Sequence, residues 1–113
     1  MARVLVADND PDALELALLD LGLEGHTVLG APDGETAMRL IDEFAPDVVV
    51  LDFRMPPGPS GLEVATLLRK TRPELRVVIY SNYQDVALVR RATELGVPFL
   101  PKGSLQTLRN AIG

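Results

Sequence analysis

The chain has 113 residues, of which 47% are hydrophobic and only 4% aromatic, a composition that predicts one globular domain with an aliphatic core. Sixteen acidic and eleven basic residues give a net charge of -5, which argues against direct binding of nucleic acid or of anionic lipid. No cysteine is present, which excludes disulfides and thiolate metal sites, and no run is long enough for a signal peptide or a membrane span, so we expect a cytoplasmic protein.

Five short apolar runs alternate with five segments of helical periodicity. The runs cover residues 4–7, 27–31, 48–51, 77–80 and 97–100. Apolar residues at helical spacing follow each run, for example Leu14, Leu18 and Leu21 after the first. Strands that alternate with helices over short connections predict an α/β fold in which a parallel sheet carries helices on both faces. The run VVVL at 48–51 is apolar at every position, which is typical of a strand buried on both sides.

Caps and glycines predict where the helices begin and end. Asp10 and Pro11 predict the N-cap and the first residue of the first helix. Gly22 and Gly25 are predicted to end that helix, and Gly96 to end the fourth one.

Polar side chains stand at the carboxyl ends of the predicted strands. Asp8 and Asn9 follow the first strand, Asp52 the third, Ser81 the fourth and Lys102 the fifth. Ligands of such sheets bind outside these strand ends. Two neighbouring carboxylates repel each other, so a site that holds Asp8 beside Asp52 favours a cation. Oxygen ligands with room for water suit Mg²⁺.

Four segments in this order resemble the receiver domain of bacterial two-component response regulators (CheY-like) across essentially the whole chain. They are VLVADND, VVVLDFRMP with a following SG, VVIYSN, and FLPKG. The resemblance implies a doubly wound, five-stranded parallel sheet in the flavodoxin-like order 2-1-3-4-5. It also implies that residues 1–113 form a single receiver domain, and the short last helix suggests a chain cut before an output region.

The resemblance implies a signalling role rather than an enzyme activity. Asp52 would accept a phosphoryl group from a histidine kinase or a phosphotransfer protein, and the domain would assist its own phosphorylation and dephosphorylation. Ser81 and Lys102 would contact phosphoryl oxygens, and Phe99 occupies the aromatic switch position. Because Phe99 has no hydroxyl, we expect any switch to act through packing.

By the same resemblance, Asp8, Asn9, Asp52 and the backbone carbonyl of Arg54 would hold Mg²⁺. Asn9 departs from the family pattern, because a neutral amide replaces an acid. We therefore expect weaker Mg²⁺ binding. The Arg54 side chain would oppose the metal further if it turned back over the site.

Other departures concern the loops and the partner surface. Gly103 follows Lys102 where the family usually has a cis-proline, which is expected to loosen Lys102. The loop at residues 57–59 has one residue more than usual, so its path is not predicted. An output domain or partner protein is expected to bind residues 84–113, which begin at Gln84 and end at Gly113.

Two alternatives remain open. Asn9 and Gly103 are compatible with a receiver-like interaction module that does not turn over phosphate. A hydrolase of the haloacid dehalogenase type would use Asp8 as nucleophile and Asp10 as acid and base. No acidic motif follows Lys102, which counts against the hydrolase. Phosphorylation of Asp52 would separate the receiver from both alternatives.

Overall fold

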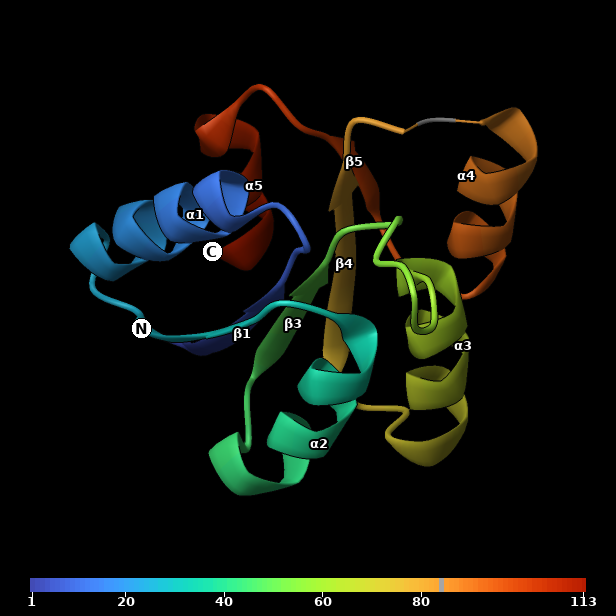
Figure 1. Ribbon diagram of the computed structural model, residues 1–113, viewed down its shortest axis with the longest axis horizontal. Helices are drawn as coiled ribbons and strands as arrows, with labels where there is room; N and C mark the ends of the chain where they lie inside the picture. Colours follow the sequence, from blue (N-terminus) through green and yellow to red (C-terminus); the bar gives the residue numbers. More distant parts are fainter. Residues whose placement is uncertain (84) are drawn as a thin grey trace.

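Strands and helices alternate along the whole chain. The computed structural model describes residues 1–83 and 85–113 (Figure 1). The elements are β1 (Arg3–Ala7), α1 (Pro11–Leu23), β2 (Thr27–Ala31), α2 (Gly34–Phe44), β3 (Val48–Leu51), α3 (Gly61–Thr71), β4 (Arg76–Ser81), α4 (Val86–Glu94), β5 (Phe99–Pro101) and α5 (Leu105–Ile112). Within the described residues, none of the helices combines the length and the apolar composition that crossing a membrane requires.

The five strands form one parallel sheet in the order β2-β1-β3-β4-β5, which confirms the predicted fold class. Helices α1 and α5 cover one face, and α2, α3 and α4 cover the other (Figure 1). Consecutive residues of a strand point to opposite faces, so Val4 and Val6 belong to the first core and Leu5 and Ala7 to the second. All four residues of β3 are buried, as the uninterrupted apolar run predicts.

The start of α1 agrees with the sequence, but its end does not. Asp10 is the N-cap, and its carboxylate accepts hydrogen bonds from the backbone N–H groups of Asp12 and Ala13. Gly22 lies inside α1, so the prediction that it ends the helix was wrong. The turn is made by Gly25 at φ +94°, a conformation that favours glycine.

The last strand begins two residues later than predicted. Gly96 does end α4, with φ +72°. The next residue, Val97, donates its N–H to the Ala92 carbonyl at 2.9 Å, so it belongs to the helix cap rather than to the sheet. Pairing with β4 begins when Ile79 donates to the Pro98 carbonyl at 2.9 Å. The C-cap therefore shortens β5 to Phe99–Pro101.

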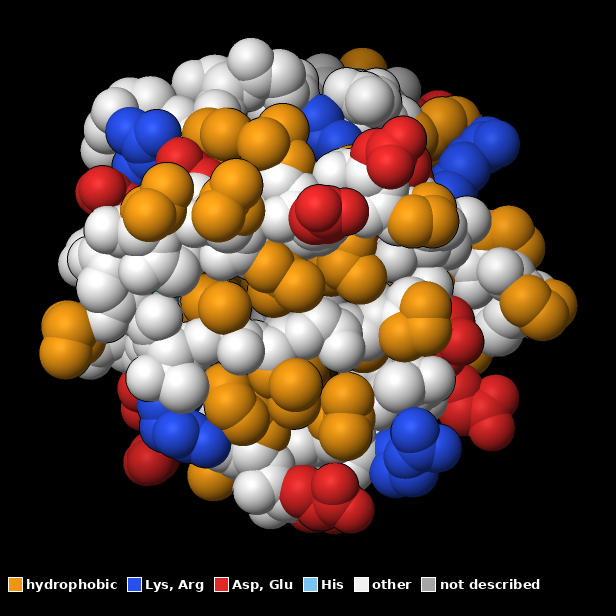
Figure 2. Space-filling model, turned by 60° about the vertical axis from the view of Figure 1, so that its left-hand side comes forward, with side chains coloured by type: hydrophobic (Ala, Val, Ile, Leu, Met, Phe, Trp, Pro, Cys, Tyr) orange, Lys and Arg blue, Asp and Glu red, His pale blue; other side chains and the backbone are white. Residues whose placement is uncertain are grey.

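Helix α1 is apolar on more than the face that it buries. Ala17 and Leu21 are buried against the sheet, whereas Leu16, Leu19 and Leu23 on other sides of the helix are exposed. Figure 2 views the molecule from the side that carries α1, and hydrophobic side chains reach the surface there in several groups. Surface helices of globular domains more often present a polar outer face.

Candidate functional site

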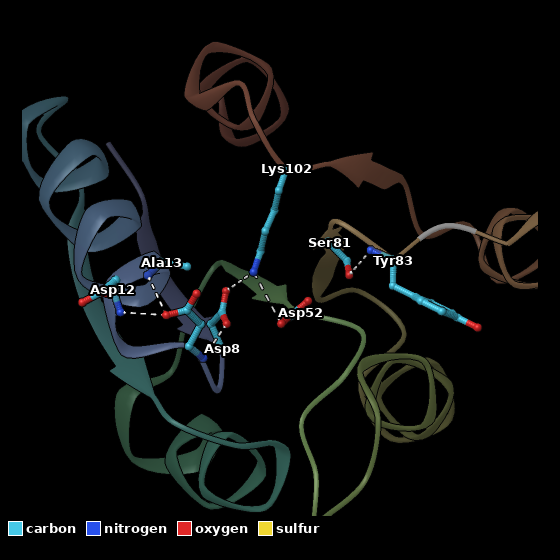
Figure 3. Close-up of polar contacts among 8 residues, drawn as sticks. Asp8, Asp12, Ala13, Asp52, Ser81, Tyr83 and Lys102 are labelled. Carbon is cyan, nitrogen blue, oxygen red and sulfur yellow. Dashed lines mark hydrogen bonds and ion pairs between the residues drawn. The ribbon is translucent and has the colours of Figure 1, made fainter.

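Four polar side chains meet at the carboxyl edge of the sheet. Asp8 follows β1, Asp52 follows β3, Ser81 is the last residue of β4 and Lys102 follows β5. They come from separate strands and point toward a common centre (Figure 3). The strand order reverses between β1 and β3, which is where sheets of this type bind ligands. The structure thus brings together four of the residues that the sequence singled out.

The Lys102 ammonium group lies between the two carboxylates. Its Nζ is 2.5 Å from Oδ2 of Asp8 and 3.4 Å from Oδ2 of Asp52 (Figure 3). Asp8 and Asp52 are buried, and only 13% of the Lys102 side chain is exposed. One positive charge therefore faces two negative charges in a region with little water, so the cluster is short of positive charge.

Hydrogen bonds to neighbouring strands fix the backbone of these residues. The Asp52 N–H donates to the Ala7 carbonyl at 2.9 Å, and the Lys102 N–H donates to the Ser81 carbonyl at 3.1 Å. Oδ1 of Asp8 accepts a hydrogen bond from the Asp10 N–H at 2.9 Å, which leaves Oδ2 directed at Lys102. The side chains are therefore presented by the ends of a rigid sheet rather than by free loops.

Burial raises the pKa of the Asp52 carboxyl, and the charge of Asp8 raises it further. The Ser81 hydroxyl and the Lys102 charge act in the opposite direction but do not outweigh these effects. Burial by itself would lower the pKa of Lys102, but the hydrogen bond to Asp8 and the charges of Asp52 and Asp8 raise it overall. Lys102 therefore stays charged, and Asp52 is more basic than an ordinary aspartate.

An aromatic stack joins the loops that follow β3 and β4. The rings of Phe53 and Tyr83 are nearly parallel, with centroids 5.3 Å apart, and the Arg54 guanidinium lies 3.9 Å from the centre of the Tyr83 ring. The Tyr83 N–H donates to the Ser81 Oγ at 3.1 Å, so the hydroxyl proton of Ser81 is free to donate elsewhere. The sequence analysis did not single out Phe53 and Tyr83. Phe53 directly follows Asp52 and Tyr83 lies two residues after Ser81, which is notable where only 4% of residues are aromatic.

Asp8 and Asp52 can offer two negative charges to a divalent cation, one fewer than a site with three acids would offer. Within residues 1–83 and 85–113, no three His, Cys, Asp or Glu side chains are grouped so that they could hold a metal. Asp8 and Asp52 form a buried pair, and Asn9 is exposed beside them at the same edge. These are oxygen donors of the kind that Mg²⁺ prefers, and the repulsion between the two carboxylates favours a bound cation. The Arg54 side chain rests on Tyr83 instead of turning back over the site.

The other predicted residues lie around this cluster. Phe99 is partly buried and packs against the core on the α2, α3 and α4 side of the sheet. Gly103 has φ +114°, and Lys102 before it contacts both Asp8 and Asp52, so the expected loosening of Lys102 stays a prediction. The loop at residues 57–59 reaches the start of α2, where Pro59 lies against Gly34. Gln84, the first residue of the expected partner surface, lies outside the described residues.

The response regulator receiver domain family matches residues 4–112. This chain belongs to that family. The transcriptional activator protein ExaE of Pseudomonas putida is 40% identical over 106 residues, which cover 92% of this chain and 49% of that protein. The probable transcriptional regulatory protein NarL of Mycobacterium tuberculosis is 39% identical over 108 residues, 93% of this receiver and 50% of the relative. The chain spans about half the length of the curated relatives it matches.

Solved structures agree with the fold of this receiver. A DNA-binding response regulator of the LuxR family from Staphylococcus aureus superimposes with a TM-score of 0.91 at 28% identity, covering 99% of this chain and 96% of that one. A LuxR-family two-component response regulator from Aurantimonas gives a TM-score of 0.89 at 31% identity, covering 99% and 82%. These solved structures therefore agree with the family assignment and with the five-stranded fold.

Proposed function

We propose that this receiver accepts a phosphoryl group on Asp52 from a histidine kinase or a phosphotransfer protein. The observation that carries the proposal is the buried cluster in which Lys102 contacts both Asp52 and Asp8. Asp52 stands at the end of a buried strand, is more basic than usual and faces a charge-deficient centre. A nucleophilic carboxylate needs such basicity, together with positive groups that offset the charge of an incoming phosphoryl group.

The transfer step forms one bond and breaks one. A carboxylate oxygen of Asp52 attacks the phosphorus, and the bond from phosphorus to the imidazole nitrogen of the donor histidine breaks. The bonding electrons remain on the imidazole. The Ser81 hydroxyl can donate to one phosphoryl oxygen, and Lys102 can pair with another, so the receiver assists the reaction by positioning and charge. Hydrolysis of the acyl phosphate would later regenerate Asp52.

The residues that would hold Mg²⁺ are Asp8, Asn9, Asp52 and, through its backbone carbonyl, Arg54. When bound, Mg²⁺ would supply positive charge to the phosphoryl oxygens. In our proposal the reaction depends on this cation because Lys102 alone offsets only one of the two carboxylate charges.

Phosphorylation would change the structure at the carboxyl ends of β4 and β5. If Ser81 and Lys102 turn to the phosphoryl group, the loop after β4 moves with them, and Phe99 can repack into the space that this movement leaves. The surface affected would be the described part of the expected partner face, residues 85–113, which would bind an output domain or a partner protein. Beryllofluoride, a phosphoryl mimic, should then change hydrogen exchange in residues 81–92 and 99–104.

Asn9 supports a second candidate function, an interaction module without phosphate turnover. The exposed amide of Asn9 contributes no charge to the metal position. Unchanged hydrogen exchange at proven beryllofluoride occupancy would favour this candidate. The hydrolase alternative loses its acid and base, because the Asp10 carboxylate is exposed and caps α1.

Intact-mass spectrometry tests the proposed function. The protein is incubated with Mg²⁺ and a small phosphodonor such as acetyl phosphate, and we expect one phosphoryl adduct. The adduct should be absent in Asp52→Asn. An adduct that persists in Asp52→Asn and disappears in Asp8→Asn would support the hydrolase instead. No adduct in the wild-type protein would favour the interaction module.

A further inference from the structure

The backbone of Asp52 is held against Gly61, the first residue of α3. A Cβ atom added to Gly61 would lie 2.2 Å from the Asp52 carbonyl oxygen, 3.0 Å from its carbonyl carbon and 3.2 Å from Cα of Phe53. The Gly61 N–H donates to the Phe53 carbonyl at 2.8 Å. The eight residues between Asp52 and Gly61 therefore form a loop whose two ends meet at the backbone of Asp52 and Phe53, and the contact leaves no space for a side chain at Gly61.

Neither side of this contact can move easily. On one side, Asp52 continues a fully buried strand, and its N–H is bound to Ala7 of β1. On the other side, Ser60 and Glu63 form a capping box that fixes the start of α3. The first turns of α3 are buried through Leu62, Val64 and Ala65. A side chain at Gly61 would therefore have to displace backbone on one side or the other.

A second glycine supports the far part of the same loop. A Cβ atom at Gly34, the first residue of α2, would lie 2.9 Å from the Pro59 carbonyl oxygen and 3.0 Å from Cγ2 of Val64. The fit is close but less tight than at Gly61. In contrast, a Cβ atom at Gly58 would meet nothing within 4 Å. An added Cβ atom would therefore crowd the loop severely at Gly61, less severely at Gly34 and not at all at Gly58.

We infer that Gly61 and Gly34 are positioning residues for phosphoryl transfer, acting through the loop that follows Asp52. Gly61 sets where the Asp52 carboxylate stands relative to Lys102 and Ser81, and Gly34 sets the path of the proline-containing loop above it. Pro59 of this loop lies against Gly34. This inference rests on the proposed function, since it concerns the reaction at Asp52.

The test compares Gly61→Ala, Gly34→Ala and the matched control Gly58→Ala. The rate of adduct formation from Mg²⁺ and acetyl phosphate is measured against donor concentration and expressed per folded molecule, with the folded fraction taken from circular dichroism. A displacement of about 1 Å at a reacting group can cost roughly 100-fold in rate. We expect a maximal rate about 100-fold lower in Gly61→Ala, several-fold lower in Gly34→Ala and unchanged in Gly58→Ala, with the half-saturating donor concentration unchanged in all three.

A merely structural role would reduce the folded fraction but leave the rate of the folded molecules unchanged. A Gly61→Ala protein that folds and reacts within twofold of the wild-type rate would therefore overturn the inference. If Gly61→Ala does not fold, Gly34→Ala decides, because a wild-type rate in that variant overturns the inference and a reduced rate supports it. If the wild-type protein takes up no phosphoryl group, the proposed function fails, and with it the inference, which rests on that function.

Discussion

Asp20 and Asp52 both contact a basic side chain, yet their pKa values are shifted in opposite directions. Asp20 on α1 forms a two-pronged pair with Arg109 on α5, in which Nε and a terminal nitrogen of Arg109 lie 2.9 Å and 2.7 Å from the two carboxylate oxygens. This hydrogen-bonded pairing lowers the pKa of Asp20 even though burial acts against it. In contrast, burial and the charge of Asp8 raise the pKa of Asp52.

The difference lies in how many charges share one partner. Arg109 forms an ion pair with one carboxylate, Asp20, and this partly buried pair connects α1 to α5. Lys102 is shared by two buried carboxylates, so the site keeps an excess of negative charge in the folded protein. The balanced pair of Asp20 and Arg109 stabilises the fold. In the unbalanced cluster, the excess negative charge favours the binding of a further cation and keeps the Asp52 carboxylate basic.

The largest expected effect comes from removing the ammonium group of Lys102, which Asp8 and Asp52 share. Lys102→Met would leave two buried carboxylates without a positive charge beside them, and we expect it to lower the free energy of unfolding by about 3 kcal/mol at neutral pH. Urea denaturation measures the loss. Arg109→Met is the matched control, which breaks the pair with Asp20 and should cost clearly less, because it leaves one unpaired carboxylate instead of two. Equal losses in the two variants would show that the cluster is no more charge-deficient than the Asp20–Arg109 pair.

Adding a negative charge to the cluster should increase its affinity for Mg²⁺. Asn9→Asp would supply a third acid at the same edge, so we expect Mg²⁺ to bind more tightly by on the order of 1 to 2 kcal/mol. The same change should lower thermal stability without metal, because carboxylate repulsion increases. Titration calorimetry measures the affinity. An unchanged affinity would mean that Asn9 is not a ligand.

Removing each aspartate charge should give pH profiles of opposite sign. Because the pKa of Asp52 is raised above its ordinary value of 3.8, its charge costs stability as the pH rises through the folded-state value. We therefore expect Asp52→Asn to be more stable than wild type at neutral pH, by on the order of 1 kcal/mol, with the gain vanishing below about pH 3.8.

Asp20→Asn should behave in the reverse way and with the smallest effect. The pKa of Asp20 is lowered, so its contribution is fully present above 3.8 and is lost as the pH falls through the lower folded-state value. The variant should be slightly less stable than wild type at neutral pH and equal to it in strong acid. Urea denaturation across the acid range measures both variants, and profiles of the same sign would contradict the comparison.

The sequence predicted the residues of the cluster because they stand at strand ends. Apolar runs mark the strands, and a parallel arrangement brings every carboxyl end to one edge, so Asp8, Asp52, Ser81 and Lys102 could be placed together without coordinates. Asp10 could be assigned as a cap for a similar reason, since capping depends on its immediate neighbours alone.

Contacts between loops could not be predicted in the same way. The stacking of Tyr83 on Phe53 and the approach of Gly61 to Asp52 depend on how separate segments meet after folding. The start of β5 was misplaced because Val97 is apolar and β-branched, which predicts a strand. In the structure its N–H donates to the Ala92 carbonyl in the cap of α4. The strand propensity of a single side chain yields here to the hydrogen bonding of the neighbouring helix cap.

The most direct test of the central claim identifies the residue that carries the phosphoryl group. Borohydride reduces an aspartyl phosphate to homoserine, releasing phosphate, and tandem mass spectrometry then locates the changed residue. After incubation with Mg²⁺ and acetyl phosphate, we expect homoserine at position 52 and an unchanged residue at position 8. Homoserine at position 8, with position 52 unmodified, would contradict the assignment of Asp52 as the phosphoacceptor.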